Sequence, residues 1–442
     1  MHVSLPSDIL DEEVEAGAIS WPEAHDRSDG PDMAMAIADG VLAAIALAKR
    51  PIIFAPPQLS SVGGRALLKE LEEATHAPAV ILESLRGIAD ATLGAFADLL
   101  REVDLVVLLG KALDFTTRWT AAPDFRSDVR VIAIDPEAAL VERAARETGS
   151  RLLIGCMADV RNAAKTLIAR ASSADRRGSE WFKKARAALD HRPREWASVA
   201  SSTEGRLHPA ELFRALRPHV ESDEDAVLVC DGGEIGQWAQ SMLPVRRRLT
   251  NGISGSIGGS ISLALAARYA EPSAPVFAVL GDGTIGFHLA EFETAVRCRL
   301  PFVAVVGNDG CWNAESQIQL KTYGPNRMHG CELTPARYDL VMRCAWRTRG
   351  ICGSGGRPSR CDRPRPCKRE AGLHKRHDRK RRGSDDAPGT SCTVANSVRS
   401  ASILSDAFGL AALYCADHLT GGVGYQECFG GVSDEPKQSF VR

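Results

Sequence analysis

The sequence predicts an α/β protein with two doubly wound parallel-sheet domains and an irregular C-terminal segment. From Met33 to Val306, short apolar runs alternate with stretches of helical spacing. This rhythm is typical of open parallel sheets that are covered by helices on both faces. Several apolar runs end in glycine-containing turns, which occur where such sheets bind ligands. Beyond Val341 both features stop, and Arg, Pro, Gly and Cys dominate the sequence.

The first 32 residues precede this rhythm. Residues 1–16 begin as if in the middle of a strand. Residues His2–Leu5 alternate between polar and apolar as a strand does, and they lead directly into the turn Pro6-Ser7-Asp8. A native N-terminal edge strand is the alternative interpretation of these residues. Residues 17–32 are rich in Pro, Gly and Asp, a composition that predicts a linker.

Residues 33–170 are predicted to form the first α/β domain. Its expected helices are 33–48, 63–75, 90–102 and 137–146, and its expected strands are 51–55, 79–82, 105–109, 129–134 and 152–154. The G-x-G-x-x-G spacing of a dinucleotide fingerprint is missing, so we do not expect FAD or a nucleotide here. Asp135 follows a strand, where a ribose-binding acid would lie. An N-cap before Pro136 is its more ordinary role.

Residues 171–206 are predicted to form a helical connector. They mix charged residues with Trp181, Phe182 and Trp196, and we expect these aromatic side chains to pack between the domains. Residues 207–342 then form the second α/β domain. Its expected helices are 209–216, 261–269 and 287–298, and its expected strands are 226–230, 276–280 and 302–306.

Two strand ends of the second domain carry oxygen ligands. Gly281-Asp282-Gly283 ends one strand, and Asn308-Asp309-Gly310 ends the next. Adjacent parallel strands would bring Asp282 and Asn308 to the same edge of the sheet. A carboxylate and an amide oxygen suit Mg²⁺ shared with a phosphate-bearing ligand, and N–H groups at 284–286, where a helix opens, would face the same phosphates. An ordinary βαβ unit with a tight turn is the alternative.

This spacing, with the intervening words E-x-E-T-A-V-R and L-P, resembles the thiamine diphosphate motif of the superfamily of acetolactate synthase, benzoylformate decarboxylase and benzaldehyde lyase. The resemblance, strongest to the acetolactate synthase large subunit, covers most of residues 1–341. It implies that Asp282 and Asn308 ligate Mg²⁺ through their side chains and Gly310 through its carbonyl. It also implies thiamine diphosphate as cofactor, and formation or cleavage of a C–C bond on a 2-oxo acid or aldehyde.

The resemblance assigns further cofactor contacts. The word Asp231-Gly232-Gly233-Glu234, followed by Trp238, matches an element that contacts the diphosphate from the other side in the family. The cofactor-binding candidates at the strand ends are therefore Gly233, Glu234, Gly281, Gly283 and Thr284.

The glycine-rich stretch Gly252–Ser260 opens a predicted helix, and small residues there allow close approach of a cofactor. A flexible loop is the alternative. In the family a bulky residue at the position of Ile257 holds the two cofactor rings in a V, so Gly255 and Ile257 are cofactor-binding candidates. Ser262 stands where the family has a proline.

The segment after Gly310 covers the mouth of the active site in the family and varies with substrate. Trp312 and Glu315 are therefore candidate substrate-side residues. His288 falls inside the predicted helix that follows the Gly-Asp-Gly turn. We expect it to face outward on the surface and assign it no role.

Residues 1–16 resemble the words that close the family's first, pyrimidine-binding domain. We therefore expect them to be a remnant of that domain, in a chain that is truncated or whose start is mis-assigned. In the family that domain supplies the Glu that activates the cofactor, so no catalytic residue can be assigned here. The chain would then be inactive alone, or a half-enzyme completed by a partner chain that carries the missing domain. The resemblance also implies a homodimer or homotetramer.

Residues 343–442 do not follow the family. Three interpretations compete: translation in a shifted frame that gives disordered chain, a basic nucleic-acid tail, and a zinc site. The tail lacks interleaved aromatic residues, and a zinc site of Cys361, Cys367, His374 and His377 has the spacing of no usual finger. The shifted frame is favoured, and nucleic acid is not expected as a partner. Ala401–Tyr414 is one apolar run with helical spacing.

The charge distribution separates this segment from the rest of the chain. Residues 343–382 hold 15 Lys or Arg and three Asp or Glu, so the other residues carry a formal net charge of −14. The chain has no apolar run of transmembrane length and no secretory pattern, which predicts a cytoplasmic protein without a membrane partner. The 12 cysteines include no C-x-x-C pair, so no zinc or redox motif stands out.

Overall fold

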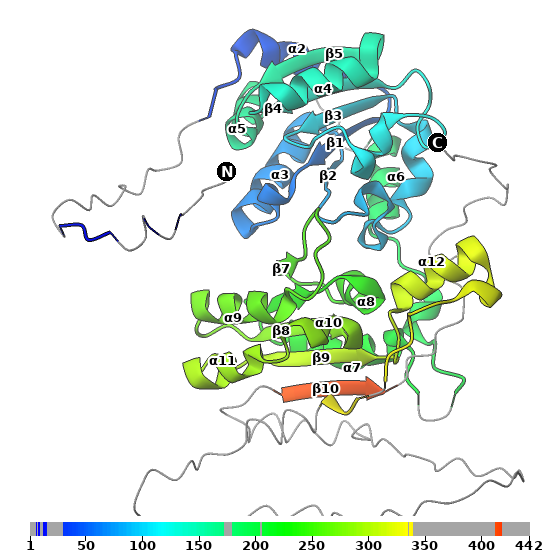
Figure 1. Cartoon of the computed structure of the whole chain (residues 1–442). Coiled ribbons are helices and arrows are strands. Elements are labelled where there is room, and N and C mark those ends of the chain that lie inside the picture. Colours follow the sequence, from blue (N-terminus) through cyan, green and yellow to red (C-terminus); the bar gives the residue numbers. More distant parts are fainter. Residues whose placement is uncertain are drawn as a thin grey trace, which may run out of the picture.

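The computed structural model describes residues 30–171, 179–203, 206–334, 336–338 and 412–417, together with residues 6, 8 and 12–15. These residues build two α/β domains, each with a five-stranded sheet whose strand pairs are all parallel (Figure 1). The fold class expected from the sequence is therefore confirmed. The basic segment 343–382 lies outside the described residues, as do most residues of the expected remnant and linker.

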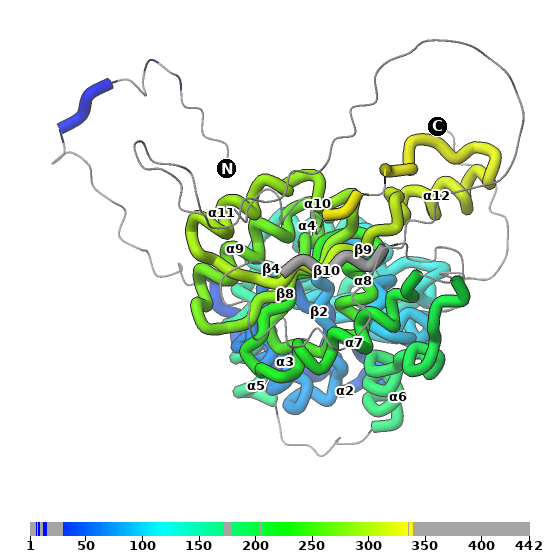
Figure 2. Tube along the Cα trace, turned by 90° about the horizontal axis from the view of Figure 1, so that it is seen from below, coloured from blue at the N-terminus to red at the C-terminus, as the bar shows by residue number. Residues whose placement is uncertain are grey.

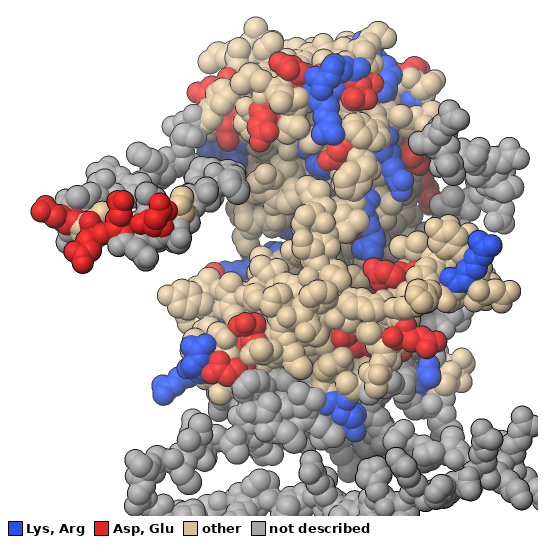
Figure 3. Space-filling view, viewed as in Figure 1, with Lys and Arg blue, Asp and Glu red and all other residues tan. Residues whose placement is uncertain are grey.

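The surface of the described part carries charges of both signs. Figure 3 shows acidic and basic side chains interspersed over the visible face of both domains. Some pair along a helix at a spacing of four residues, as Arg217 does with Glu221 and Glu293 with Arg297, where the two side chains lie on one face. Within the described ranges, no helix is long and apolar enough to cross a membrane.

The first sheet has the strand order β2-β1-β3-β4-β5. Its strands are β1 (Pro51–Ala55), β2 (Ala79–Ile81), β3 (Leu105–Leu109), β4 (Arg130–Asp135) and β5 (Leu152–Met157). Its helices are α2 (Met35–Leu47), α3 (Val62–Thr75), α4 (Ala138–Thr148) and α5 (Val160–Arg170). Parallel neighbours need crossover connections, and these place helices on both faces of the sheet.

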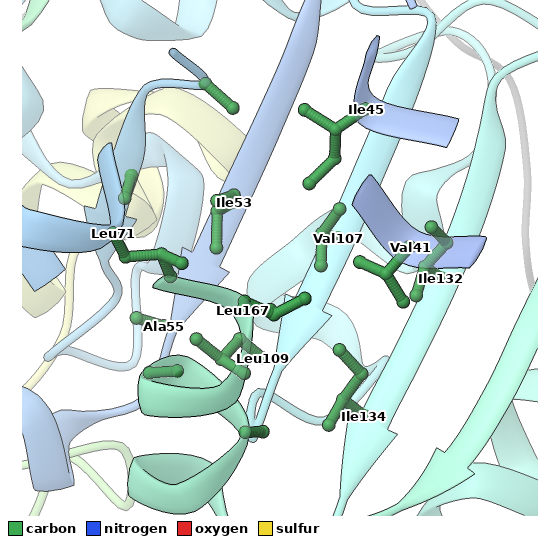
Figure 4. Packing of buried hydrophobic residues seen from close by; sticks show 14 of the residues in the cluster. Val41, Ile45, Ile53, Ala55, Leu71, Val107, Leu109, Ile132, Ile134 and Leu167 are labelled. Atoms are coloured by element: carbon green, nitrogen blue, oxygen red, sulfur yellow. The ribbon is translucent and has the colours of Figure 1, made fainter. Parts of the chain in front are cut away.

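Alternate residues of β1, β2, β3 and β4 enter one of two cores in this domain, since successive side chains of a strand point to opposite faces. Figure 4 shows one core, where Ile53 of β1, Val107 of β3 and Ile132 of β4 pack with Val41 of α2 and Leu167 of α5. The residues between them on the strands face the second core, which α6 (Glu180–Leu189) helps to cover. Burying each such aliphatic side chain contributes about 1.5–3 kcal/mol before entropy is subtracted.

The second sheet has the strand order β10-β9-β8-β6-β7. Its strands are β6 (Val227–Cys230), β7 (Arg247–Thr250), β8 (Val276–Gly281), β9 (Val303–Asn308) and β10 (Ala412–Asp417). Its helices are α7 (Pro209–Glu221), α8 (Gly233–Met242), α9 (Ser260–Ala270), α10 (Asp282–His288), α11 (Glu291–Cys298) and α12 (Asn313–Tyr323). Figure 2 shows α9 and α11 on one side of the sheet and α7 and α8 on the other, in agreement with the two cores they cover.

The aromatic residues of the connector do not share one site between the domains. Trp181 lies in a core of the first domain, and its Nε1 donates to the carbonyl of Pro51 at 2.8 Å. Trp196 lies in a core of the second domain, where its ring centroid is 4.8 Å from that of Trp238. Phe182 is half-buried. The connector is thus anchored by one buried indole in each domain.

Several expected elements were wrong in type or extent. Residues 90–102 form short 3₁₀ segments at Ala91–Leu93 and Phe96–Glu102 instead of an α-helix. The reason is local: Gly94 has a φ of +60°, which interrupts a right-handed helix. The helix expected over 287–298 instead begins at Asp282 as α10 and continues as α11 after a break. Residues 412–414, expected to be helical, belong to β10.

Candidate functional site

The two polar strand ends meet at one edge of the second sheet. β8 and β9 are paired in parallel, with Gly281 opposite Gly307. This register places Asp282 and Asn308 directly beyond the paired residues, at the carboxyl ends of the two strands. Both side chains are buried, with exposed fractions of 4% and 3%. Because buried polar groups need partners, their hydrogen bonds define the local geometry.

The Asp282 carboxylate is held by backbone N–H groups. Its Oδ1 accepts from the N–H of Gly283 at 2.9 Å, and its Oδ2 accepts from the N–H of Gly310 at 2.8 Å. Burial raises the pKa of Asp282, and these backbone hydrogen bonds oppose the rise. The Tyr338 hydroxyl donates to the Asp282 carbonyl at 3.1 Å. The bond to Gly310 ties the two strand-end turns together.

Asn308 is oriented by the chain beyond the second turn. Its Nδ2 donates to the Ala336 carbonyl at 2.8 Å. Gly310 has a φ of +69°, a conformation that favours glycine, and it lets the chain turn back so that its own N–H reaches Asp282. Thr284 closes the turn after β8, because its Oγ1 accepts from the N–H of Gly281 and donates to the Gly281 carbonyl, both at 3.0 Å.

A cleft with a volume of about 70 Å³ opens beside these turns. Eight of the candidate residues line it: Gly233, Glu234, Gly281, Asp282, Gly283, Thr284, Trp312 and Glu315. Asn308 and Gly310 do not line the cleft, although their chain neighbours Gly307, Asp309 and Cys311 do. Sites for whole drug-sized ligands measure about 300–1,000 Å³, so the described cleft has room for only one end of such a ligand.

An aromatic wall forms one side of the cleft. A Cβ added to Gly283 would lie 2.6 Å from the Trp312 ring, so glycine is required for this close approach. Phe287, which is 57% exposed, meets Trp312 edge-on with ring centroids 6.1 Å apart. Glu315 is exposed at the rim.

The opposite side of the cleft is built around Asp231, which is 1% exposed. Its Oδ1 accepts from the N–H groups of Gly232 at 2.7 Å and Gly258 at 3.0 Å, and its Oδ2 accepts from that of Ser260 at 3.2 Å. These bonds fasten the glycine-rich loop before α9 to the end of β6. Asp231 is not among the site residues predicted from the sequence, although its position at a strand end was a usable signal.

Ile257 lies above this junction rather than in the lining of the cleft. A Cβ added to Gly232 would lie 2.7 Å from the Cγ2 atom of Ile257. The Ile257 side chain is 37% exposed. Gly255, with a φ of +68°, packs instead against Leu85 of the first domain. The two candidates of this loop are thus split between the cleft region and the domain boundary.

His288 does not face outward as expected. It is half-buried, and its Nδ1 lies 2.6 Å from the Gly258 carbonyl, so it links α10 to the glycine-rich loop. Asp135 is also not the N-cap of α4, which is Glu137. Asp135 instead accepts from the Glu137 N–H at 2.9 Å, as an Asx turn does.

Further residues of the cleft were missed by the sequence analysis. Asp309 lines it, and burial together with the charges of Asp282 and Glu234 raises its pKa to about 7. Asn313 donates from its Nδ2 to Glu234 Oε2 at 2.6 Å, and burial raises the pKa of Glu234. Asp309 was visible as the middle residue of the Asn-Asp-Gly word, but no spacing rule pointed to Asn313.

The fold and the cleft define a class of protein: two parallel-sheet domains, of which the second presents a buried carboxylate and amide beside a glycine-lined cleft. Residues 231–347 match the family model "Thiamine pyrophosphate enzyme, C-terminal TPP binding domain". This stretch of the chain is therefore similar to the C-terminal, cofactor-binding domain of thiamine pyrophosphate enzymes.

Curated relatives extend the similarity over most of the chain. It is 28% identical over 352 residues to 2-hydroxyacyl-CoA lyase 2 of Xenopus laevis, a match that covers 74% of this chain and 50% of that protein. It is 30% identical over 324 residues to a probable acetolactate synthase of Mycobacterium bovis, with 71% of this chain and 56% of that protein covered. The chain therefore spans about half the length of the curated relatives it matches.

Proposed function

We propose that the chain binds thiamine diphosphate together with Mg²⁺ at the cleft beside β8 and β9. The observation that carries this proposal is that Asp282 and Asn308 are both buried at the carboxyl ends of the adjacent strands β8 and β9, in the domain that matches the family model. Mg²⁺ prefers oxygen ligands and is commonly shared between one or two side chains and substrate phosphates.

The residues present fit this ion. The two backbone N–H groups that hold Asp282 fix the direction of its carboxylate. Asn308 is fixed through its Nδ2, so its amide oxygen is the atom it would offer to a cation. The Gly310 carbonyl would be the third ligand. All three are hard oxygen donors, which suit Mg²⁺ better than a soft metal.

The diphosphate would occupy the glycine-lined part of the cleft. Gly233 and Glu234 open α8, whose N-cap Gly232 makes no side-chain capping bond. The first N–H groups of a helix have no intrahelical acceptor, so they favour an anion. Gly281, Gly283 and Thr284 would contact the same group from the β8 side. The small volume of the cleft agrees with a site for this end of the cofactor alone.

The chain's own residues would position the remaining part of the cofactor and exclude water. Ile257 lies over Gly232, where its side chain would support the rings, and Trp312 would close the other side, with Glu315 at the rim facing the substrate. When bound, thiamine diphosphate supplies the carbon centre that makes or breaks a C–C bond next to a carbonyl. We therefore propose a 2-oxo acid or aldehyde as substrate; the names of the relatives, a lyase and a synthase, fit cleavage or formation of a bond.

We further propose that turnover needs polypeptide beyond the described residues. Ile257 and Phe287 remain 37% and 57% exposed beside a cleft that holds one end of the cofactor. A pyrimidine-binding domain would cover them and supply the activating Glu. A cytoplasmic location also stays a prediction.

The test is calorimetric titration of the full chain with thiamine diphosphate, with MgCl₂ and with EDTA. We expect saturable binding only with Mg²⁺, and an affinity lower by at least about tenfold, or 1.4 kcal/mol, in Asp282→Ala and Asn308→Ala. Asp98→Ala, which removes an exposed carboxylate in the first domain, is the matched control and should bind normally. Absence of Mg²⁺-dependent binding, or unchanged affinity in Asp282→Ala, would refute the proposal.

A further inference from the structure

A second cavity lies between the two domains. Its volume is about 320 Å³, and it shares no lining residue with the cleft. Its walls come from α3, β2 and the 83–93 loop of the first domain, from α6 and Arg192 of the connector, and from Gln240 and Arg248 of the second domain. This volume reaches the range of small-molecule sites.

The lining is rich in charged side chains. Five are cationic, namely Arg65, Lys69, Arg186, Arg192 and Arg248, and four are acidic, namely Glu72, Glu83, Asp90 and Asp190. The acidic groups are already engaged, with the exception of the exposed Asp190. Asp90 Oδ1 accepts from the N–H of Thr92 at 2.8 Å, and Asp90 Oδ2 accepts from the Ser84 hydroxyl.

The two glutamates are satisfied in the same way. Glu72 Oε1 accepts from a backbone N–H at the start of β2 at 2.9 Å, and its Oε2 pairs with Arg186. Glu83 Oε1 pairs with Arg65, and its Oε2 pairs with Arg248 at 2.8 Å. Each carboxylate oxygen therefore has a partner within the wall. A ligand that entered the cavity would therefore meet the five cations and one carboxylate without a hydrogen-bond partner among the described residues, that of the exposed Asp190.

The guanidinium groups keep donors to spare. Each carries five N–H bonds, yet Arg186 contacts only Glu72 among the described residues, and its side chain stays 38% exposed. Arg65 uses its Nε and Nη2 and is 37% exposed. Burial and the nearby charge of Arg248 lower the pKa of Arg192, although Asp190 opposes this. An added negative charge in the cavity would relieve this repulsion.

The cavity also offers apolar surface. Ile81 and Leu93, both half-buried, line it beside the buried Leu68 and Val80. An inorganic ion would leave this apolar surface in contact with water, whereas an organic anion would bury it. We propose that the interdomain cavity binds a small organic anion that carries a carboxylate or phosphate group, held by Arg65, Lys69 and Arg186 and contacted from the second domain by Arg248.

The experiment is calorimetric titration of the full chain with citrate, as a carboxylate, and with AMP, as a phosphate, at constant ionic strength set with KCl. We expect saturable binding of at least one of them, with a Kd below about 1 mM. The double substitution Arg186→Gln with Glu72→Gln removes both charges of one pair, and it should weaken binding at least about tenfold. Lys69→Gln changes an exposed side chain without a buried partner and should weaken it about threefold.

The control keeps this inference separate from the proposed function. Asp282→Asn alters the cleft of the second domain and should leave anion binding unchanged. Circular dichroism establishes that each variant is folded, and Lys69→Gln decides the question if the double variant is not. Binding of neither anion would overturn the inference, and so would equal affinity in wild type and Lys69→Gln or in wild type and a folded double variant.

Discussion

The ion pair between Glu83 and Arg248 joins the two domains and is a demanding test of the electrostatic reasoning. Glu83 lies beyond β2 of the first domain, and its side chain is 9% exposed, while that of Arg248, on β7, is 17% exposed. Arg248 donates to Glu83 Oε2 from Nη2 at 2.8 Å and from Nε at 3.1 Å. The two-donor geometry favours a strong pair.

The expected magnitude follows from this burial. Two unit charges about 4 Å apart attract by about 4 kcal/mol at an effective dielectric constant of 20, and desolvation offsets part of that. Glu83→Gln keeps the shape of the side chain but leaves the buried Arg248 guanidinium without its charge partner. We expect it to lower the free energy of unfolding by about 2–4 kcal/mol.

The assay is a double-mutant cycle by urea unfolding with Glu83→Gln, Arg248→Gln and the double variant. We expect a coupling energy of about 2 kcal/mol. The matched control is the pair Glu293–Arg297, whose side chains are 44% and 62% exposed, and whose coupling should stay below about 0.5 kcal/mol. Equal coupling in the two pairs would show that burial does not strengthen the interdomain pair, and the reasoning would fail.

Two further predictions concern the cleft. Gly283→Ala places a methyl group 2.6 Å from the Trp312 indole and should destabilise the protein by about 1–3 kcal/mol. Gly286→Ala is the control and should not destabilise it, because nothing lies within 4 Å of the added Cβ. Equal shifts of the thermal midpoint in the two variants would contradict this. In metal-free protein, the pKa of Asp309 is raised to about 7 in the folded state, so this carboxyl group ionises at a lower pH in the unfolded chain than in the folded one. The free energy of unfolding should therefore fall by up to about 4 kcal/mol as pH rises from about 4 to 7. Asp309→Asn should remove most of that fall, as measured by urea unfolding across this pH range; the raised pKa values of Asp282 and Glu234 account for the remainder.

The sequence was sufficient for those elements whose pattern and burial agree. The β8 and β9 segments are apolar runs that are buried on both faces, and their predicted bounds were close to those observed. Their polar ends could be placed together because parallel neighbours end at the same edge of a sheet. The proximity of Asp282 and Asn308 needed no more than this.

Elements at edges and boundaries were harder to predict. β7 has the sequence Arg-Arg-Leu-Thr, and charged residues are common on edge strands because they discourage pairing with other chains. Such a strand resembles a loop in sequence. The role of His288 depends on the Gly258 carbonyl, which lies 30 residues earlier in the chain, and no local pattern carries that information. The same holds for Asn313 and Glu234.

The connector, anchored by one indole in each domain, has a consequence for motion. Any hinge between the domains would have to bend between Trp181 and Trp196. Within that stretch, Arg192 donates to the Thr92 carbonyl of the first domain and to the Ser241 carbonyl of the second, each at 2.9 Å. Because the connector is anchored by a buried Trp at each end and hydrogen-bonded to both domains through Arg192, the domains have little freedom to rotate relative to each other. The two domains should therefore move as one rigid body on the nanosecond timescale, and opening would first require the Arg192 hydrogen bonds to break.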